Sequence, residues 1–310
     1  MAYKELATKK PFIVNKNLGS PVEVEPEELT QTNADGLPVV IPTQKQKYDF
    51  DRKGWLLIPN ILSGAEIVEM REFCERLNAE PDSIPEPQRC ALGGPLQRLA
   101  DHPVVVGFLN EFLAYPPAAS EDCYGFRLEE TEMIFGVEDK KVKNQFTSQK
   151  GNGLFRLPGD SHIYRCVPGR GWSGLTRAIW ELSEVNAETN SFQFITGSHK
   201  AAYTAPQAVH NLNSPLWDTY ECPPGSLFLL TESITQMHGQ ATSNSTSIDR
   251  MSVSNLYNTV ASRWSNWMPH PELLEAMPSK RQTLFRETYA GGNVINGDFG
   301  NRTSAYPMQI

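Results

Sequence analysis

Two alternating runs between residues 159 and 200 constrain the fold more than any other feature of the sequence. Apolar and polar side chains alternate around Trp180 and again over residues 192–194, a pattern typical of β-strands because successive side chains point to opposite faces. A polar turn separates the runs and Gly197 ends the second, so the sequence predicts a β-hairpin. His162 stands ahead of the first run, which places a metal-binding residue type at one end of that hairpin.

Capping signals predict two helices closer to the N-terminus. Ser63 and Glu66 form a capping box that opens a helix from Gly64 to about Leu77. Pro103 heads a second helix over the apolar residues 104–113, because proline is tolerated in a first turn.

Short strands make up the rest of the predicted core. They fall at residues 55–58, 127–135, 225–230 and 251–260, and a helical piece follows at 272–277. The charged residues 50–53 predict a turn, and the Gly/Pro-rich residues 168–174 predict a plain loop. The chain has no βαβ rhythm and no G-x-G-x-x-G motif, so we predict a mainly β fold with covering helices, a sandwich or barrel.

The central segment resembles the phytanoyl-CoA dioxygenase (PhyH) family. The resemblance lies in Leu182-Ser183-Glu184-Val185, Asn190, Phe192, Phe194 and Gly197-Ser198-His199-Lys200. The strand and helix entry over residues 54–66 is also similar, whereas Ser191 and Thr196 stand where the family usually has Gly and Pro. The resemblance implies a double-stranded β-helix core of the jelly-roll or cupin-like kind, and an oxidoreductase that depends on Fe(II) and 2-oxoglutarate.

Iron ligands follow from the same resemblance. Enzymes of this class hold Fe(II) with two His and one carboxylate, and the family pattern maps onto His162, 18 residues before Trp180, and onto His238. The carboxylate expected at position 164 is replaced by Tyr164. The third ligand position therefore stays open between Tyr164, Asp160 and water.

A co-substrate site is implied next to the metal. Arg250 stands 12 residues after His238, where the family has an arginine that pairs with the distal carboxylate of 2-oxoglutarate. Ser252 shares the strand face of Arg250 and is expected to donate to the same carboxylate. Trp180 is expected to wall the pocket from the strand opposite.

Bulk properties exclude several classes of protein. A net charge of -8 and a pI near 5.4 argue against nucleic-acid binding by phosphate neutralisation. The N-terminus lacks the apolar run of a signal peptide, and five cysteines without C-x-x-C spacing favour a cytoplasmic protein with reduced thiols. No run is apolar enough to cross a membrane, and we predict an extended arm over residues 1–45 and a single domain over 46–310.

Two functions are consistent with these features. The first is an Fe(II)/2-oxoglutarate-dependent dioxygenase of the phytanoyl-CoA dioxygenase type that hydroxylates or similarly oxidises a small molecule. The second is a catalytically silent or metal-poor relative that keeps a ligand-binding pocket. Tyr164 separates the two, because the His-x-Asp motif is here His-Ile-Tyr.

Overall fold

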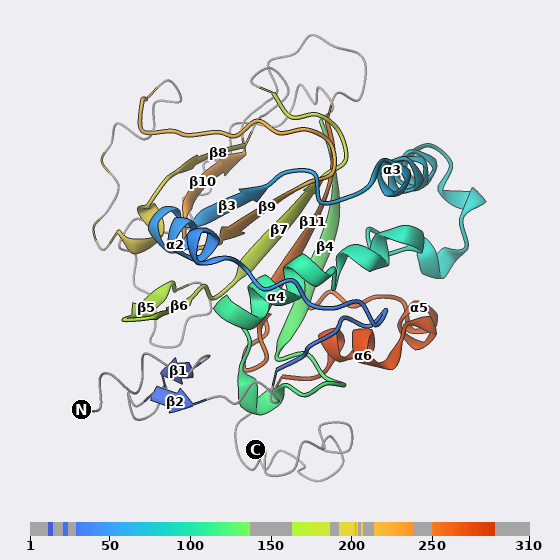
Figure 1. Ribbon diagram of the computed structural model, residues 1–310. Coiled ribbons are helices and arrows are strands. Elements are labelled where there is room, and N and C mark those ends of the chain that lie inside the picture. The colour runs from blue at the N-terminus through green and yellow to red at the C-terminus, as the bar shows by residue number, and fades with distance from the viewer. Residues whose placement is uncertain are drawn as a thin grey trace.

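Antiparallel sheet dominates the computed structural model, which describes residues 29–136, 163–186, 192–201, 203, 206, 214–238 and 250–288 and the short strands β1 (Phe12–Val14) and β2 (Pro21–Glu23). Every pairing between named strands is antiparallel in this part of the chain, and a few helices cover the sheet (Figure 1). This arrangement is compatible with a jelly-roll-like core. Among the described helices, none has both the length and the apolar composition needed to cross a membrane.

A five-stranded sheet forms the centre of the molecule. Its order is β3 (Trp55–Ile58), β9 (Ser226–Thr231), β7 (Thr176–Glu181), β11 (Arg250–Thr259) and β4 (Phe126–Gly136). The predicted strands at 55–58, 127–135, 225–230 and 251–260 are therefore confirmed. The central strand, β7, is paired along both edges, so its side chains are buried on both faces of the sheet except for part of Arg177.

The register of β7 separates the two faces. Trp180 lies opposite Val253 of β11 and Leu227 of β9, whereas Glu181 lies opposite Ser252 and Ser226. Directly opposed residues in an antiparallel pair share a face. We call the face that carries Trp180 the outer face and the face that carries Glu181 the inner face.

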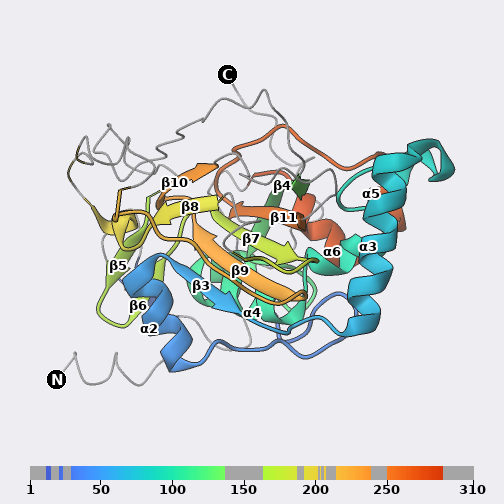
Figure 2. The ribbon, with the colours of Figure 1, turned by 90° about the horizontal axis from the view of Figure 1, so that it is seen from above.

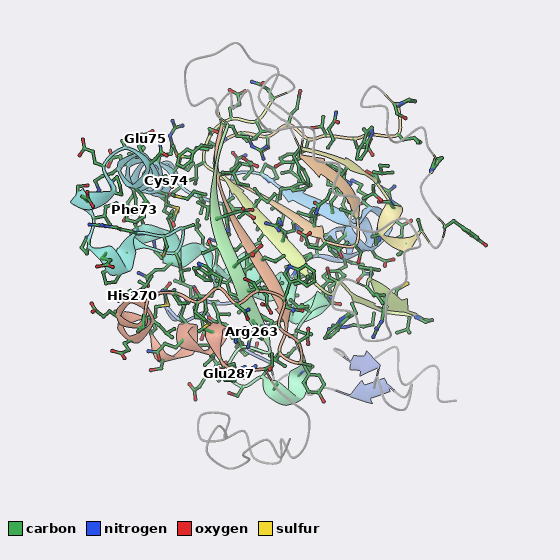
Figure 3. The ribbon with its side chains drawn as sticks, turned by 180° about the vertical axis from the view of Figure 1, so that it is seen from behind. Phe73, Cys74, Glu75, Arg263, His270 and Glu287 are labelled. Carbon is green, nitrogen blue, oxygen red and sulfur yellow. The ribbon has the colours of Figure 1, made fainter. Side chains whose placement is uncertain are left out.

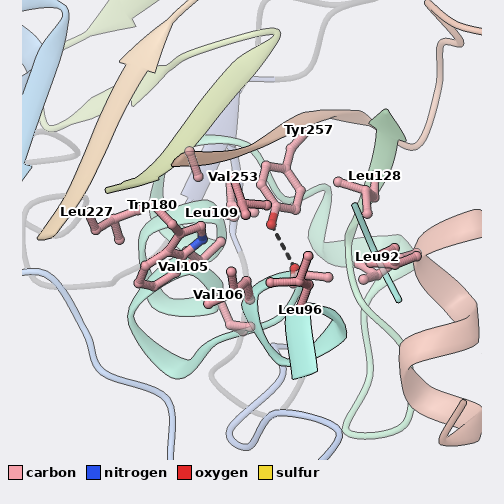
Figure 4. Packing of buried hydrophobic residues seen from close by; sticks show 14 of the residues in the cluster. Leu92, Leu96, Val105, Val106, Leu109, Leu128, Trp180, Leu227, Val253 and Tyr257 are labelled. Atoms are coloured by element: carbon pink, nitrogen blue, oxygen red, sulfur yellow. Dashed lines mark hydrogen bonds between the residues drawn. The ribbon is translucent and has the colours of Figure 1, made fainter. Parts of the chain in front are cut away.

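Helices pack against the outer face. The helices are α3 (Gly64–Ala79) and α4 (Pro103–Phe112), joined through the 3-10 helix η4 (Gly94–Leu99). Figure 4 shows Trp180, Leu227 and Val253 of the sheet gathered against the apolar side chains of α4 and η4. The capping box of Ser63 and Glu66 opens α3, with the Glu66 carboxylate accepting from the Ser63 backbone N–H at 2.9 Å, so both predicted helices are confirmed.

A second, two-stranded sheet faces the inner face. It pairs β8 (Phe192–Ile195) with β10 (Thr235–His238), and it lies across the five-stranded sheet from α4 (Figures 1 and 2). Phe192 and Phe194 pack on Phe228 of β9, with ring centroids 6.0 and 5.4 Å apart. The predicted hairpin of β7 with β8 is wrong, because β7 pairs with β9 and β11 and the two strands belong to different sheets.

Two local predictions are also wrong. Residues 50–53 end helix α2 (Gln44–Lys53) rather than a turn, and a capping box of Thr43 and Gln46 opens that helix. The helix ends at Gly54, whose φ of 84° favours glycine and whose added Cβ would lie 2.6 Å from His199 Nδ1. The predicted loop at 168–174 contains most of a small hairpin of β5 (Arg165–Val167) and β6 (Arg170–Trp172).

The remaining helices are short. They are α5 (Pro271–Ala276), which confirms the helical piece predicted at 272–277, α6 (Ser279–Gln282), and the 3-10 turns η2 (Pro81–Ser83), η3 (Glu86–Gln88), η5 (Pro116–Ala118), η6 (Ser198–Lys200) and η8 (Thr283–Phe285).

The described part of the predicted N-terminal arm lies on the core. Thr30 is buried and donates a hydrogen bond to the Ser120 carbonyl at 3.0 Å. Asp35 accepts from the Arg281 guanidinium at 2.6 Å, and Arg281 also donates to the buried Asp101 at 2.8 Å. Thr30 and Asp35 thus attach this segment to the core, and Arg281 links Asp35 to helix α6.

Histidines cap both α4 and α5. His102 Nδ1 accepts from the Val104 N–H at 3.3 Å, and its ring packs edge-on against Trp180 with centroids 5.0 Å apart. Burial lowers the pKa of His102 from its ordinary value of 6.5 to about 4. The neutral ring is therefore the form that caps α4.

His102→Asn is expected to make the free energy of unfolding less dependent on pH between about pH 4 and pH 6.5. The unfolded chain protonates this imidazole at higher pH than the folded protein does, so its stabilisation is complete above pH 6.5 and is lost as the pH falls toward 4. The loss over this window is about 2–3 kcal/mol, and Asn keeps a capping oxygen without titrating there. Urea unfolding of both proteins at several pH values measures the difference.

The matched control is His270→Asn. His270 caps α5 through the same Nδ1 contact, to the Glu272 N–H, but its side chain is exposed at the start of that helix (Figure 3). We expect a smaller change in slope because no buried neutral imidazole is removed. Equal changes in the two variants would contradict the role of burial at His102.

Candidate functional site

A buried arginine and a buried glutamate pair on the inner face. Arg250, the first residue of β11, is 4% exposed, and Glu181, the last residue of β7, is 0% exposed. Arg250 Nη2 donates to Glu181 Oε1 at 2.6 Å, and Arg250 Nε donates to Oε2 at 3.3 Å. The guanidinium thus holds a carboxylate through two parallel hydrogen bonds, the geometry that a planar guanidinium provides.

Tyr220 completes this cluster. Its hydroxyl donates to Glu181 Oε1 at 2.5 Å and accepts from Arg250 Nη2 at 2.8 Å. Its ring stacks on Phe228 with centroids 4.1 Å apart and an interplanar angle of 9°. Burial and the neighbouring Glu181 raise the pKa of Tyr220 well above its usual range, so the phenol is a neutral donor.

The charge on Arg250 is stabilised by these partners. Burial alone opposes a charged guanidinium, but Tyr220 and Glu181 together raise the pKa of Arg250. Ser252 lies two residues further along β11 on the same face, opposite Glu181 in the register. Its Oγ is fully buried and has no hydrogen-bond partner among the described residues.

A second arginine lies four residues before Glu181 on the same strand face. Arg177 donates to Glu232 at 2.6 Å, to Glu132 at 2.8 Å and to Ser254 Oγ at 2.8 Å. Gln236 of β10 donates to the other oxygen of Glu232 at 2.8 Å, which links the five-stranded sheet to the two-stranded one. Arg250 and Arg177 are therefore each paired with carboxylates of the chain itself.

Trp180 lies on the outer face and not beside Arg250. It is 0% exposed and belongs to the core that α4 covers (Figure 4). The inner-face residue next to it is Ile179, which lies opposite Ser254 and Phe228. A one-residue difference reverses the face of a strand residue, so Trp180 does not wall the space around Arg250 as the sequence analysis predicted.

Trp180→Ala is expected to reduce stability without affecting an inner-face ligand. Removing a fully buried indole from the core costs roughly 3–5 kcal/mol in the free energy of unfolding. Chemical denaturation measures this loss, and calorimetric titration with 2-oxoglutarate measures ligand affinity at a temperature where the variant is folded. A variant of normal stability that loses ligand binding would contradict this placement.

The histidines proposed for the metal are only partly described. His238 ends β10, opposite Phe192 in the register, and its imidazole lies outside the described part of the structure. His162 and Asp160 also lie outside the described residues. Within those residues, no group of three or more His, Cys, Asp and Glu side chains is arranged to hold a metal ion.

Tyr164 is engaged by α2. Its hydroxyl donates to Asp51 Oδ1 at 2.7 Å, and its ring packs edge-on against His199 with centroids 4.7 Å apart. Lys200 Nζ contacts the same Asp51 oxygen at 2.8 Å. Gly171 of β6 passes so close that an added Cβ would lie 2.5 Å from the Tyr164 hydroxyl, which explains glycine there.

This placement does not favour Tyr164 as an iron ligand. Burial and Asp51 raise the pKa of Tyr164 above its usual range, so the phenolate that could bind Fe(II) is disfavoured. Burial opposes ionisation of Asp51, but hydrogen bonds from Lys200 and Tyr164 lower its pKa. Tyr164 therefore joins β5 to α2 as a neutral donor to a charged carboxylate.

Two substitutions of Tyr164 should rank by their effect on stability. Tyr164→Phe removes one hydrogen bond to a carboxylate and is expected to cost about 1–2 kcal/mol. Tyr164→Asp removes the buried ring and brings a second carboxylate toward Asp51, so it is expected to cost about 3 kcal/mol or more. Guanidinium unfolding at neutral pH measures both, and an Asp variant as stable as wild type would contradict the Asp51 contact.

Known proteins resemble this chain in structure rather than in sequence. No family model matches it, and no curated protein sequence matches it. HygX from Streptomyces hygroscopicus with nickel and 2-oxoglutarate bound is similar with a TM-score of 0.56 and 20% identity, covering 74% of this chain and 91% of that chain. HygX with iron bound gives a TM-score of 0.54 and 19% identity, covering 76% and 94%.

A third HygX structure, with nickel, 2-oxoglutarate and hygromycin B bound, gives a TM-score of 0.55 and 20% identity and covers 73% of this chain and 90% of that chain. At these identities the likeness shows that the fold is shared. The phytanoyl-CoA dioxygenase resemblance stays a prediction.

The sequence patterns did not predict Glu181, Tyr220 and Asp51 as partners of the site residues. A signal was present for Glu181. Arg177 and Glu181 are charged residues on one face of a strand whose neighbours are apolar, and such charges need partners when they are buried. No comparable signal exists for Tyr220, which lies in a loop, or for Asp51, which lies on a helix, because the apolar–polar alternation of strands says nothing about such segments.

Proposed function

We propose that this chain is an Fe(II)/2-oxoglutarate-dependent oxygenase of the phytanoyl-CoA dioxygenase type that oxidises a small molecule by hydroxylation or a related reaction. The observation that carries the proposal is the buried guanidinium of Arg250, which lies on the inner face at the start of β11 and has the geometry to bind a carboxylate. The shared fold with HygX supports it, because HygX structures contain iron, nickel and 2-oxoglutarate. A double-stranded β-helix is the core that we propose for residues 46–310, with residues 1–45 as an arm.

His162 and His238 are the proposed iron ligands. The third position falls to Asp160 or water, since Tyr164 is held by Asp51. Position 238 is two residues beyond Gln236 on β10, and the side chain of Gln236 donates to Glu232. When bound, iron and 2-oxoglutarate supply the oxidising chemistry for a C–H bond of the substrate.

The residues around Arg250 fit the carboxylate of a co-substrate in chemical type. Arg250 supplies two parallel N–H donors, Tyr220 supplies a neutral O–H donor, and Ser252 supplies a buried hydroxyl without a described partner. Phe228 and Phe194 surround the cluster with apolar surface, which excludes water and strengthens these contacts. In the structure the carboxylate held there is that of Glu181.

A second function is favoured by two specific contacts. Glu181 already occupies the Arg250 guanidinium, and Tyr164 is committed to Asp51 rather than to a metal. Both contacts support a metal-poor relative that keeps a ligand-binding site without oxygenase activity. The HygX relatives also bind small molecules, hygromycin B among them, so the ligand in either case is expected to be a small molecule.

Anaerobic addition of Fe(II) and 2-oxoglutarate distinguishes the two functions. We expect a weak visible charge-transfer band, its loss in His162→Ala and in His238→Ala, and its retention in the control His270→Ala, whose side chain is exposed at the N-cap of α5. Iron should co-purify or titrate with a stoichiometry near one, as metal analysis measures. A protein without a band and without bound iron supports the silent relative and contradicts the oxygenase.

A further inference from the structure

We propose that Glu181 is an internal carboxylate that competes with 2-oxoglutarate for Arg250. The proposal rests on the proposed function, in which Arg250 anchors the distal carboxylate of the co-substrate. It assigns a specific role to Glu181, which sets the affinity of the inner-face anion site by occupying the site itself.

The backbone fixes Glu181 at this place. It ends β7, paired with Ser226 on one side and with Ser252 on the other, so its side chain emerges on the inner face beside the start of β11. Oε1 accepts from both Arg250 and Tyr220, and Oε2 accepts from Arg250. The Nε and Nη2 donors of Arg250 and the hydroxyl of Tyr220 are thus engaged with Glu181.

For electrostatic reasons, Glu181 and a carboxylate of 2-oxoglutarate are not expected to bind Arg250 at the same time. Among the described residues, Glu181 and Arg250 form an oppositely charged pair that is buried from solvent. A 2-oxoglutarate carboxylate added beside Glu181 would bring a second negative charge to the same guanidinium in a buried setting, which is unfavourable. Arg177 does not offer a replacement, because it is held by Glu232 and Glu132. Binding at Arg250 therefore requires that Glu181 leaves or is neutralised.

Ser252 offers a hydrogen bond to a carboxylate that enters this site. Its Oγ is fully buried, lies opposite Glu181 in the register and has no described hydrogen-bond partner. A carboxylate that replaced Glu181 would meet Arg250, Tyr220 and this hydroxyl. The ligand class is a small carboxylate or dicarboxylate, with 2-oxoglutarate as the case required by the proposed function.

Removal of Glu181 should open a carboxylate site. We expect Glu181→Ala to bind acetate, glutarate and 2-oxoglutarate at least ten-fold more tightly than wild type, without iron, and to gain thermal stability from these anions at constant ionic strength. Chloride should not reproduce the effect. Calorimetric titration and thermal unfolding measure the two changes.

Two further variants keep the test specific. The double variant Glu181→Ala/Arg250→Gln should lose the gain, because the guanidinium is absent. Glu132→Ala, which removes a carboxylate from the other inner-face arginine, should bind these anions like wild type. If Glu181→Ala does not fold, Glu181→Gln keeps the side-chain volume, removes the charge and replaces one acceptor oxygen by an amide donor. A smaller gain in affinity than in Glu181→Ala is expected for it, because the amide still fills part of the site.

The outcomes separate this proposal from the proposed function. Carboxylate binding gained in Glu181→Ala and lost in the double variant supports the role of Glu181, even if wild type shows no iron band and the oxygenase proposal fails. Wild type that binds 2-oxoglutarate through Arg250 with an iron band, and with an affinity unchanged in both Glu181 variants, overturns the role of Glu181 and leaves the oxygenase intact. Carboxylate binding that does not depend on Arg250 also overturns it.

Discussion

The pairing of β7 along both of its edges is the constraint on which the rest of the structure depends. β9 and β11 flank this strand and both of its faces are covered, so its side chains pack on one side or the other into two separate cores. Ala178 and Trp180 pack toward α4, and Ile179 packs toward β8. The two charged residues that β7 places on the inner face are Glu181, which is buried, and Arg177, which is largely buried, and both need partners within the chain.

The partners come from distant segments, and this explains how the two sheets are held together. Glu181 meets Arg250 from β11 and Tyr220 from the segment after β8, and Arg177 meets Glu232 from the turn before β10. Breaking one member of such a buried pair leaves an uncompensated charge, which is more costly than losing an exposed ion pair. The inner face is thus positioned by electrostatic contacts as well as by its aromatic core.

Local sequence signals predicted most helices and strands, but they did not predict which strands pair or which distant residues contact one another. The Ser63–Glu66 capping box lies within four residues, and the alternation of β11 lies within one strand, so both could be recognised. Strand pairing is decided by residues far apart in the chain, so two neighbouring alternating runs suggested a hairpin although β7 and β8 belong to different sheets. The N-cap of α2 at Thr43 was missed because its charged helix lacks a clear apolar stripe.

The candidate site, too, was predicted from the sequence only in part. Side chains alternate between the two faces of a strand, so the sequence correctly predicted that Arg250 and Ser252 share a face. It placed Trp180 on the wrong face, because the neighbouring residue Ile179 is the one on the inner face. Tyr164, which departs from the family pattern, and Glu181, which the pattern did not include, have something in common. Each is engaged by a partner within the chain, Tyr164 by Asp51 and Glu181 by Arg250. Such contacts stabilise the inner face without a ligand, and any ligand that needed the same donors would have to displace these contacts before its own could form.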